Sequence, residues 1–277
     1  MRRRSPLGLA ATYATLVLAT VIALFPIFWT VSTAIKERVD TYTVPPKFLL
    51  FAPTFRNFRN LFADSAFLDA TVITIGITLA STAVAVLVGS LTGYALARQP
   101  RFATRRPLEV SLVFVRALPG VVLVIPLYDL FTDIGLYDNL LAVTLVYGAA
   151  NAPFAAWLMT SFVRQVPVEL EEAASVDGAR RLEVLGRVIL PLVLPGMAAT
   201  FIFVALLAWN EFLIPALLLS GQHKTLPVFI SAFIGNRFLD WGPMAAAASV
   251  AMVPIALFTI VVQRHLVAGL ATGAVKE

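Results

Sequence analysis

The residue types that could carry chemistry are few in this chain, and their spacing matches no enzyme motif. Among the 277 residues there is no cysteine, and the two histidines, His223 and His265, lie far apart in the sequence. A metal site built from Cys or His ligands is therefore not expected. No Gly-x-x-x-x-Gly-Lys-Ser/Thr phosphate loop, Gly-x-Ser-x-Gly elbow or His-Glu-x-x-His helix occurs. We therefore expect no catalytic residue, no metal and no cofactor in this chain.

The most informative charged residues lie in a segment whose pattern predicts a short helix with marked ends. Pro167 suits the first turn of a helix. Glu169, Glu171 and Glu172 follow it, where the helix dipole favours negative charge. Gly178 suits the stop at the other end, because glycine adopts the backbone conformation that ends many helices.

One face of this predicted helix has an unusual composition. Leu170, Ala173, Ala174 and Asp177 recur at spacings of three and four, which places them on the same side. The two alanines leave a smooth surface that another protein could approach closely. The alternative is an ordinary capped amphipathic helix lying on a membrane surface, and the residue pattern alone does not decide between the two.

The composition indicates a membrane protein. Hydrophobic residues make up 59% of the chain and charged residues 13%, whereas a soluble domain usually carries about 25% charged residues. The net charge of +5 does not indicate nucleic acid, because the basic residues lie between apolar runs instead of on one face. In a membrane protein that arrangement sets the orientation.

Apolar runs long enough to cross a bilayer, which takes about 20 helical residues, can be placed along the whole chain. They predict an all-α integral membrane protein with one transmembrane domain over residues 1–277 and six spans, near 9–33, 70–97, 108–130, 139–163, 188–212 and 241–263. Residues 213–219 form a further apolar stretch that is too short to span and is expected to be re-entrant or interfacial.

The distribution of basic residues orients these spans. With the N-terminus inside, the inner segments hold more Lys and Arg than the outer ones. The positive-inside rule then places both termini, the loop 164–187 and the tail 264–277 in the cytoplasm.

Few polar side chains fall within the predicted spans. Glu109 and Arg116 share a helical face, so Arg116 either pairs structurally with another helix or faces a translocation path. Asn210, near the outer end of the fifth span, has an amide that could donate to and accept from sugar hydroxyls. Trp209 beside it could stack on a sugar ring, but membership of the aromatic belt at the membrane surface is the favoured interpretation.

Several of these segments resemble a known family. Glu172-Ala173-Ala174-x-x-Asp177-Gly178-Ala179, followed by Ile189-x-Pro191-Leu192 and Pro195-Gly196, resembles the EAA loop of binding-protein-dependent ABC importer permeases. Other stretches are similar to the carbohydrate-uptake, MalG-like subfamily: Leu24-Phe25-Pro26-Ile27-Phe28-Trp29, Gly93-Tyr94-Ala95-Leu96-Ala97-Arg98, Trp209-Asn210-Glu211-Phe212-Leu213 and the tail Gly269-Leu270-x-x-Gly273-Ala274-Val275-Lys276. The resemblance covers nearly the whole chain.

The resemblance implies a type I ABC importer permease (MetI-like) fold with six transmembrane helices. It implies that the loop 164–187 is the coupling loop that docks on a cytoplasmic ATPase subunit, through Glu169, Leu170, Glu171, Glu172, Ala173, Ala174, Asp177 and Gly178. The tail residues Gly273, Ala274, Val275 and Lys276 are expected to contact the interface of the ATPase dimer.

The same resemblance implies partners and a location. A second permease subunit, two ATPase subunits that hold ATP and Mg²⁺, and an extracytoplasmic solute-binding protein would complete a sugar importer in the plasma membrane of a bacterium or archaeon. Uptake of a glycerol-phosphate compound or other polyol is the alternative within the family. An ion-coupled secondary transporter is the alternative from another class, and it would depend on Glu109, Arg116 and Glu211 as the ionisable residues near the spans.

Overall fold

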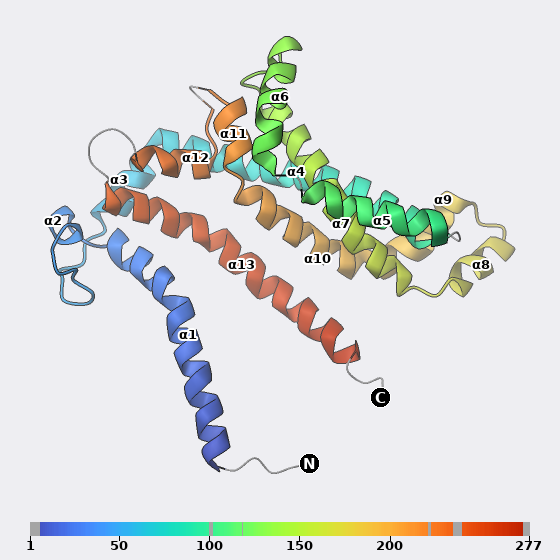
Figure 1. Cartoon of the computed structure of the whole chain (residues 1–277), viewed down its shortest axis with the longest axis horizontal. Coiled ribbons are helices and arrows are strands. Elements are labelled where there is room, and N and C mark those ends of the chain that lie inside the picture. Colours follow the sequence, from blue (N-terminus) through green and yellow to red (C-terminus); the bar gives the residue numbers. More distant parts are fainter. Residues whose placement is uncertain (1–5, 100–101, 118, 221–222, 235–239, 274–277) are drawn as a thin grey trace. The chain divides into compact units, whose positions relative to one another are not determined.

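A computed structural model describes the chain except for residues 1–5, 100–101, 118, 221–222, 235–239 and 274–277, and leaves the side chains of 6–7, 102–105, 116 and 261–273 undescribed. All the regular structure in the described residues is helical, as the sequence predicts (Figure 1). The chain divides into two compact units, one of Met1–Leu68 with Phe229–Val253 and the other of Asp69–Val228 with Pro254–Glu277.

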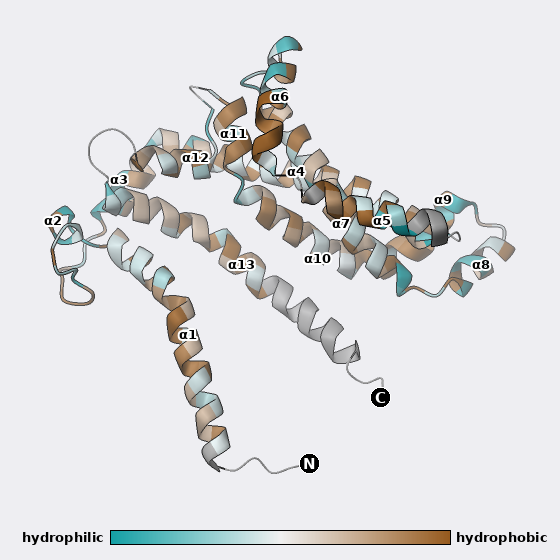
Figure 2. Ribbon diagram, in the orientation of Figure 1, coloured by the Kyte–Doolittle hydropathy of each residue, from teal (hydrophilic) through white to brown (hydrophobic). Residues whose placement is uncertain are grey.

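The first unit holds the N-terminal helix and the short helices after it. Its elements are α1 (Pro6–Ala34), α2 (Arg38–Thr41), α3 (Arg56–Ala63), the second half of α12 (Leu226–Ser231), the 3₁₀ turn η2 (Ala232–Ile234) and the first turns of α13 (Trp241–Gly273). In the most apolar 18-residue window of α1, no residue is buried by the rest of the chain. In the corresponding window of α4, 44% of the residues are buried. Hydrophobic residues run along the middle of α1 in Figure 2, which leaves this helix an apolar surface suited to lipid.

The second unit contains the remaining long helices. Its elements are α4 (Ser65–Ala97), α5 (Phe102–Arg116), α6 (Gly120–Asp133), α7 (Leu140–Arg164), α8 (Glu169–Val176), α9 (Arg181–Val184), the π-helical turn η1 (Leu185–Ile189), α10 (Leu190–Trp209) and α11 (Leu213–Leu218). The apolar stretch 213–219 is thus a short helix and not a span.

Within the part of the chain that the structure describes, five helices are long and apolar enough to cross a membrane: Gly8–Ala34, Ser65–Ala97, Leu140–Arg164, Arg181–Trp209 and Trp241–Ile260. The predicted span near 108–130 differs from these, because α5 and α6 meet at a bend of 80°. Pro119 is the N-cap residue of α6, and a residue that precedes proline is disfavoured in the α conformation. The proline therefore explains why the sixth apolar run forms two helices instead of one.

Close packing of small residues joins α4 to α7. A Cβ added at Gly89 would lie 2.5 Å from Cβ of Ala155, and one added at Gly93 would lie 2.7 Å from Cβ of Met159. Both distances are too short for real carbon atoms. Only glycine allows the two backbones to approach this closely, which is a common way for helices to associate in a membrane.

Candidate functional site

The segment after α7 forms the short helix that the sequence predicts, α8, and Gly178 ends it. Gly178 has a φ of +88°, in the left-handed region that L side chains adopt only with strain. The turn is closed by two backbone hydrogen bonds, from Gly178 N to the Ser175 carbonyl at 3.1 Å and from Ala179 N to the Ala174 carbonyl at 3.0 Å. Three glutamates occupy the first turn of the helix. Their negative charge interacts favourably with the unpaired backbone N–H groups at this end.

The two sides of α8 have different surroundings. Ala174 and Ala179 pack against a buried apolar cluster, and Glu171 is partly buried beside them. Leu170, Ala173 and Asp177 are exposed. Ala174 thus lies at the edge of the predicted face, where it packs on the cluster, while the other three members are exposed.

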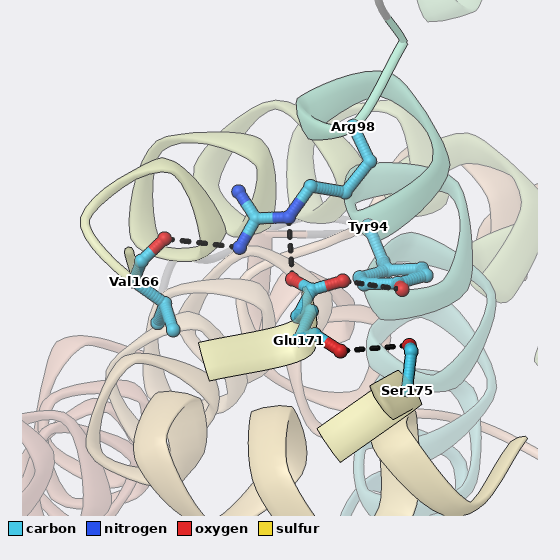
Figure 3. Close-up of polar contacts among 5 residues, drawn as sticks. All are labelled: Tyr94, Arg98, Val166, Glu171 and Ser175. Atoms are coloured by element: carbon cyan, nitrogen blue, oxygen red, sulfur yellow. Dashed lines mark hydrogen bonds and ion pairs between the residues drawn. The ribbon is translucent and has the colours of Figure 1, made fainter. Parts of the chain in front are cut away.

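Glu171 is the residue that fixes α8 to the rest of the unit (Figure 3). Its carboxylate accepts a hydrogen bond from the Tyr94 hydroxyl at 2.8 Å and another from Arg98 Nε at 2.5 Å. Arg98 Nη2 also donates to the Val166 carbonyl at 3.0 Å, which holds the chain just before the helix. The Arg98 and Glu171 side chains are only 15% and 13% exposed, so water screens this ion pair less than a surface pair.

Tyr94 and Arg98 are functional candidates that the sequence reasoning missed. Both occur in a motif quoted for the family resemblance, yet no role was assigned to either. They lie one turn apart at the end of α4, so their side chains share a helical face. A tyrosine and an arginine at this spacing, at the end of an apolar helix, form a donor pair suited to one carboxylate.

An apolar base lies beneath the anchored helix. Its buried side chains come from α7, from the residues after it, and from α9, η1 and α10: Met159, Val163, Val166, Val184, Ile189 and Val193. An ion pair between Arg164 and Glu109 joins the end of α7 to α5. Glu109 therefore has a structural partner in Arg164.

A hollow lies between α8 and the residues at the end of α4. It has a volume of about 590 Å³ and is lined by Arg98 and Glu171 of the anchoring pair together with Gln99, Glu172 and Ser175. Val176, at the end of the helix, is 87% exposed. Leu170, on the same short helix, is 44% exposed.

Of the two residues proposed for a substrate path, Asn210 has a described side chain. Asn210 is exposed at the end of α10, and its Nδ2 donates to the Leu206 carbonyl at 2.7 Å. The Arg116 side chain lies outside the described residues. Trp209 is 5% exposed, so its predicted place in an aromatic belt is wrong, because the indole packs inside the helical unit. The Glu211 carboxylate accepts from Leu213 N at 3.0 Å and so caps α11.

The proposed tail contact cannot be located. Gly273 is the last helical residue of α13, with no side-chain description, and Ala274, Val275 and Lys276 lie outside the described residues. This part of the site remains a prediction.

Comparison with known proteins decides the family. Residues 85–272 match the family described as binding-protein-dependent transport system inner membrane component. The chain belongs to this family. It is therefore a multi-pass inner-membrane permease of the ABC importer type and a transport subunit, not an enzyme. The ion-coupled alternative is thereby set aside.

Related proteins cover almost the whole chain. The trehalose transport system permease protein SugB of Mycobacterium tuberculosis is 36% identical over 258 residues, 92% of this chain and 93% of that protein. The diacetylchitobiose uptake system permease protein DasC of Streptomyces coelicolor is 32% identical over 277 residues, 99% of each chain. A solved structure of a bacterial ABC transporter involved in alginate import matches with a TM-score of 0.77 at 24% identity, covering 95% of this chain and 99% of that one. This structural match supports the MetI-like fold.

Proposed function

We propose that this permease imports a carbohydrate, with α8 as the element through which ATP hydrolysis drives transport. The sugar class is supported by the names of relatives that are at least 32% identical over nearly the whole chain, trehalose for one and diacetylchitobiose for another. The observation that carries the coupling role is the anchored Glu171, because it leaves the opposite side of α8 exposed and attached to a rigid base.

The proposed mechanism transmits a movement through rigid contacts. ATPase closure displaces α8, and the Arg98–Glu171 ion pair passes the displacement to α4. The apolar base around Val163 and Val184 passes it to α7 and α10 at the same time. Packed helices respond as bodies that switch between discrete arrangements, so a small shift at the loop can alternate access across the membrane.

Charge supports the orientation that this mechanism needs. The excess of basic residues in the loops on the α8 side supports a cytoplasmic position for the loop 164–187 and both termini. Two ATPase subunits there would hold the ATP and Mg²⁺, and an extracytoplasmic binding protein would deliver the substrate. A second permease subunit would form the path together with this chain. The tail residues Gly273, Ala274, Val275 and Lys276 are proposed to reach the ATPase dimer.

Reconstituted transport tests this proposal. The permease is purified with the second permease, the ATPase and the binding protein encoded beside it, and is placed in liposomes. Uptake of labelled trehalose, maltose, diacetylchitobiose and glycerol 3-phosphate is then measured with and without ATP on the ATPase side. We expect ATP-dependent uptake of a saccharide, lost in Glu172→Lys. Uptake of glycerol 3-phosphate alone would support the polyol alternative, and uptake without ATP would contradict the proposal.

A further inference from the structure

A cavity at the end of α1 contains a buried charge that no described residue pairs. Its volume is about 370 Å³, within the range of roughly 300–1,000 Å³ common for small-molecule sites. Its lining includes Trp29, Thr33, Lys36, Asp40, Lys47 and Trp241, all from the first unit. The cavity is far in sequence from α8 and takes no part in the coupling site.

The backbone beneath Lys36 is held in place by several bonds. Asn57 Nδ2 donates to the Ala34 carbonyl at 2.9 Å and to the Lys36 carbonyl at 3.1 Å. These are carbonyls that the end of α1 would otherwise leave without partners. A Cβ added at Gly242 would lie 2.8 Å from Asn57 Nδ2, so the start of α13 closes tightly on the same amide. Lys36 is therefore fixed in position and not carried on a loose loop.

The ammonium group of Lys36 lies among rings and not oxygens. The residue is 2% exposed, and its Nζ lies 4.2 Å from the Trp29 ring centroid and 5.1 Å from that of Phe51. Among the described residues it has neither an ion-pair partner nor a hydrogen-bond acceptor. Asp40, the carboxylate of the cavity, pairs instead with Lys47 at 2.5 Å. Burial lowers the pKa of Lys36, and the attraction of Asp40 opposes this only in part.

A second polar group in the cavity wall also lacks a partner. The Thr33 hydroxyl is buried and makes no hydrogen bond. A buried ammonium and a buried hydroxyl without acceptors are both costly. One bound anion would satisfy the two groups together. With Lys36, Lys47 and Asp40, the cavity has a net charge of +1, which matches a singly charged anion.

We propose that this cavity binds the phosphate headgroup of an anionic phospholipid in the leaflet that this end of α1 reaches. Lys36 follows the apolar span Gly8–Ala34 by two residues, which is the depth of the headgroups. Trp29 and Trp241 are of the residue type that concentrates at this level. The unburied apolar surface of α1 offers a path for the acyl chains alongside the cavity.

Native mass spectrometry of the purified full-length permease, in detergent with defined lipids, tests this site. We expect phosphatidylglycerol to bind at least about tenfold more tightly than phosphatidylcholine, because Lys36 provides a charge-assisted hydrogen bond. Lys36→Met should remove this preference, Lys36→Arg should retain it and Thr33→Val should reduce it. Lys224→Met removes an exposed lysine elsewhere and should change nothing.

The remaining outcomes each overturn the proposal. If phosphatidylglycerol binds Lys36→Met and the unaltered protein equally, the cavity is not its site. If inorganic phosphate binds as tightly as phosphatidylglycerol and displaces it, the cavity takes a soluble anion. If neither anion binds the unaltered protein, Lys36 is a structural charge held by its aromatic neighbours. If Lys36→Met does not fold, the other two variants decide. Unchanged phosphatidylglycerol binding in Thr33→Val together with lost binding in Lys36→Arg would also overturn the proposal.

Discussion

Removing the charge of Glu171 should loosen α8 without unfolding the permease. Glu171→Gln keeps the size of the side chain but replaces one carboxylate oxygen with an amide group. The pair with Arg98 and the hydrogen bond from Tyr94, at 2.5 and 2.8 Å, then lose their charge-assisted character. Glu172→Gln is a matched control, because the adjacent glutamate is exposed.

The burial of the pair sets the size of the effect. Exposed ion pairs contribute about 0–1 kcal/mol, and breaking a fully buried one costs about 3–5 kcal/mol. Side chains that are 15% and 13% exposed lie between these limits, so we expect a loss of about 2 kcal/mol. That loss corresponds to roughly a 30-fold increase in the local opening equilibrium of the loop.

Hydrogen exchange of the α8 amides measures this opening directly, since exchange through local opening reports its free energy. Glu171→Gln should exchange about 30-fold faster there, and Glu172→Gln should stay within about twofold of the unaltered protein. A double-mutant cycle with Arg98→Gln should give a coupling energy of about 2 kcal/mol. Equal exchange in the two glutamate variants, or a coupling energy below about 0.5 kcal/mol, would refute the anchoring role.

Three further predictions follow from the helices and the tail. Single cysteines at Asp133 and Ser175 should be labelled from opposite faces of the membrane by an impermeant maleimide, and labelling from one face would contradict the proposed orientation. Gly93→Ala should lower the melting temperature of the purified protein through a clash costing about 1–3 kcal/mol, while Gly76→Ala, where a Cβ meets nothing within 4 Å, should not. Deletion of residues 270–277 should lower transport or uncouple ATP hydrolysis without loss of membrane expression, and full transport by the truncated chain would show that the tail is dispensable.

The helical membrane fold could be predicted because hydropathy and helix length are properties of the sequence itself. Long uncharged runs indicate where the apolar helices lie, and α8 is marked by Glu169 and Gly178 at its ends. The break between α5 and α6 could not be predicted in the same way. Hydropathy averages over a run and does not report a bend of 80°, although Pro119 was a local signal for it.

The orientation of side chains depended on packing that the sequence does not record. Ala173 and Ala174 are the same residue type in adjacent positions, yet one is exposed and the other packs on the apolar base. Trp209 is suited equally to a membrane surface and to a helical interior, and only the neighbouring helices decide between them. The Arg98–Glu171 pair joins residues 73 positions apart, a separation that no local pattern reveals.

Site-specific cross-linking from the two adjacent alanines tests the coupling role of α8 most directly. The chain has no cysteine, so Ala173→Cys and Ala174→Cys can each carry one maleimide-linked benzophenone in the assembled transporter. The structure predicts that the probe at position 173 cross-links to the ATPase subunit and that the probe at position 174 reacts within the permease. Equal cross-linking from both positions, or none from position 173 in a complex that still hydrolyses ATP with transport, would contradict the docking of α8 on the ATPase.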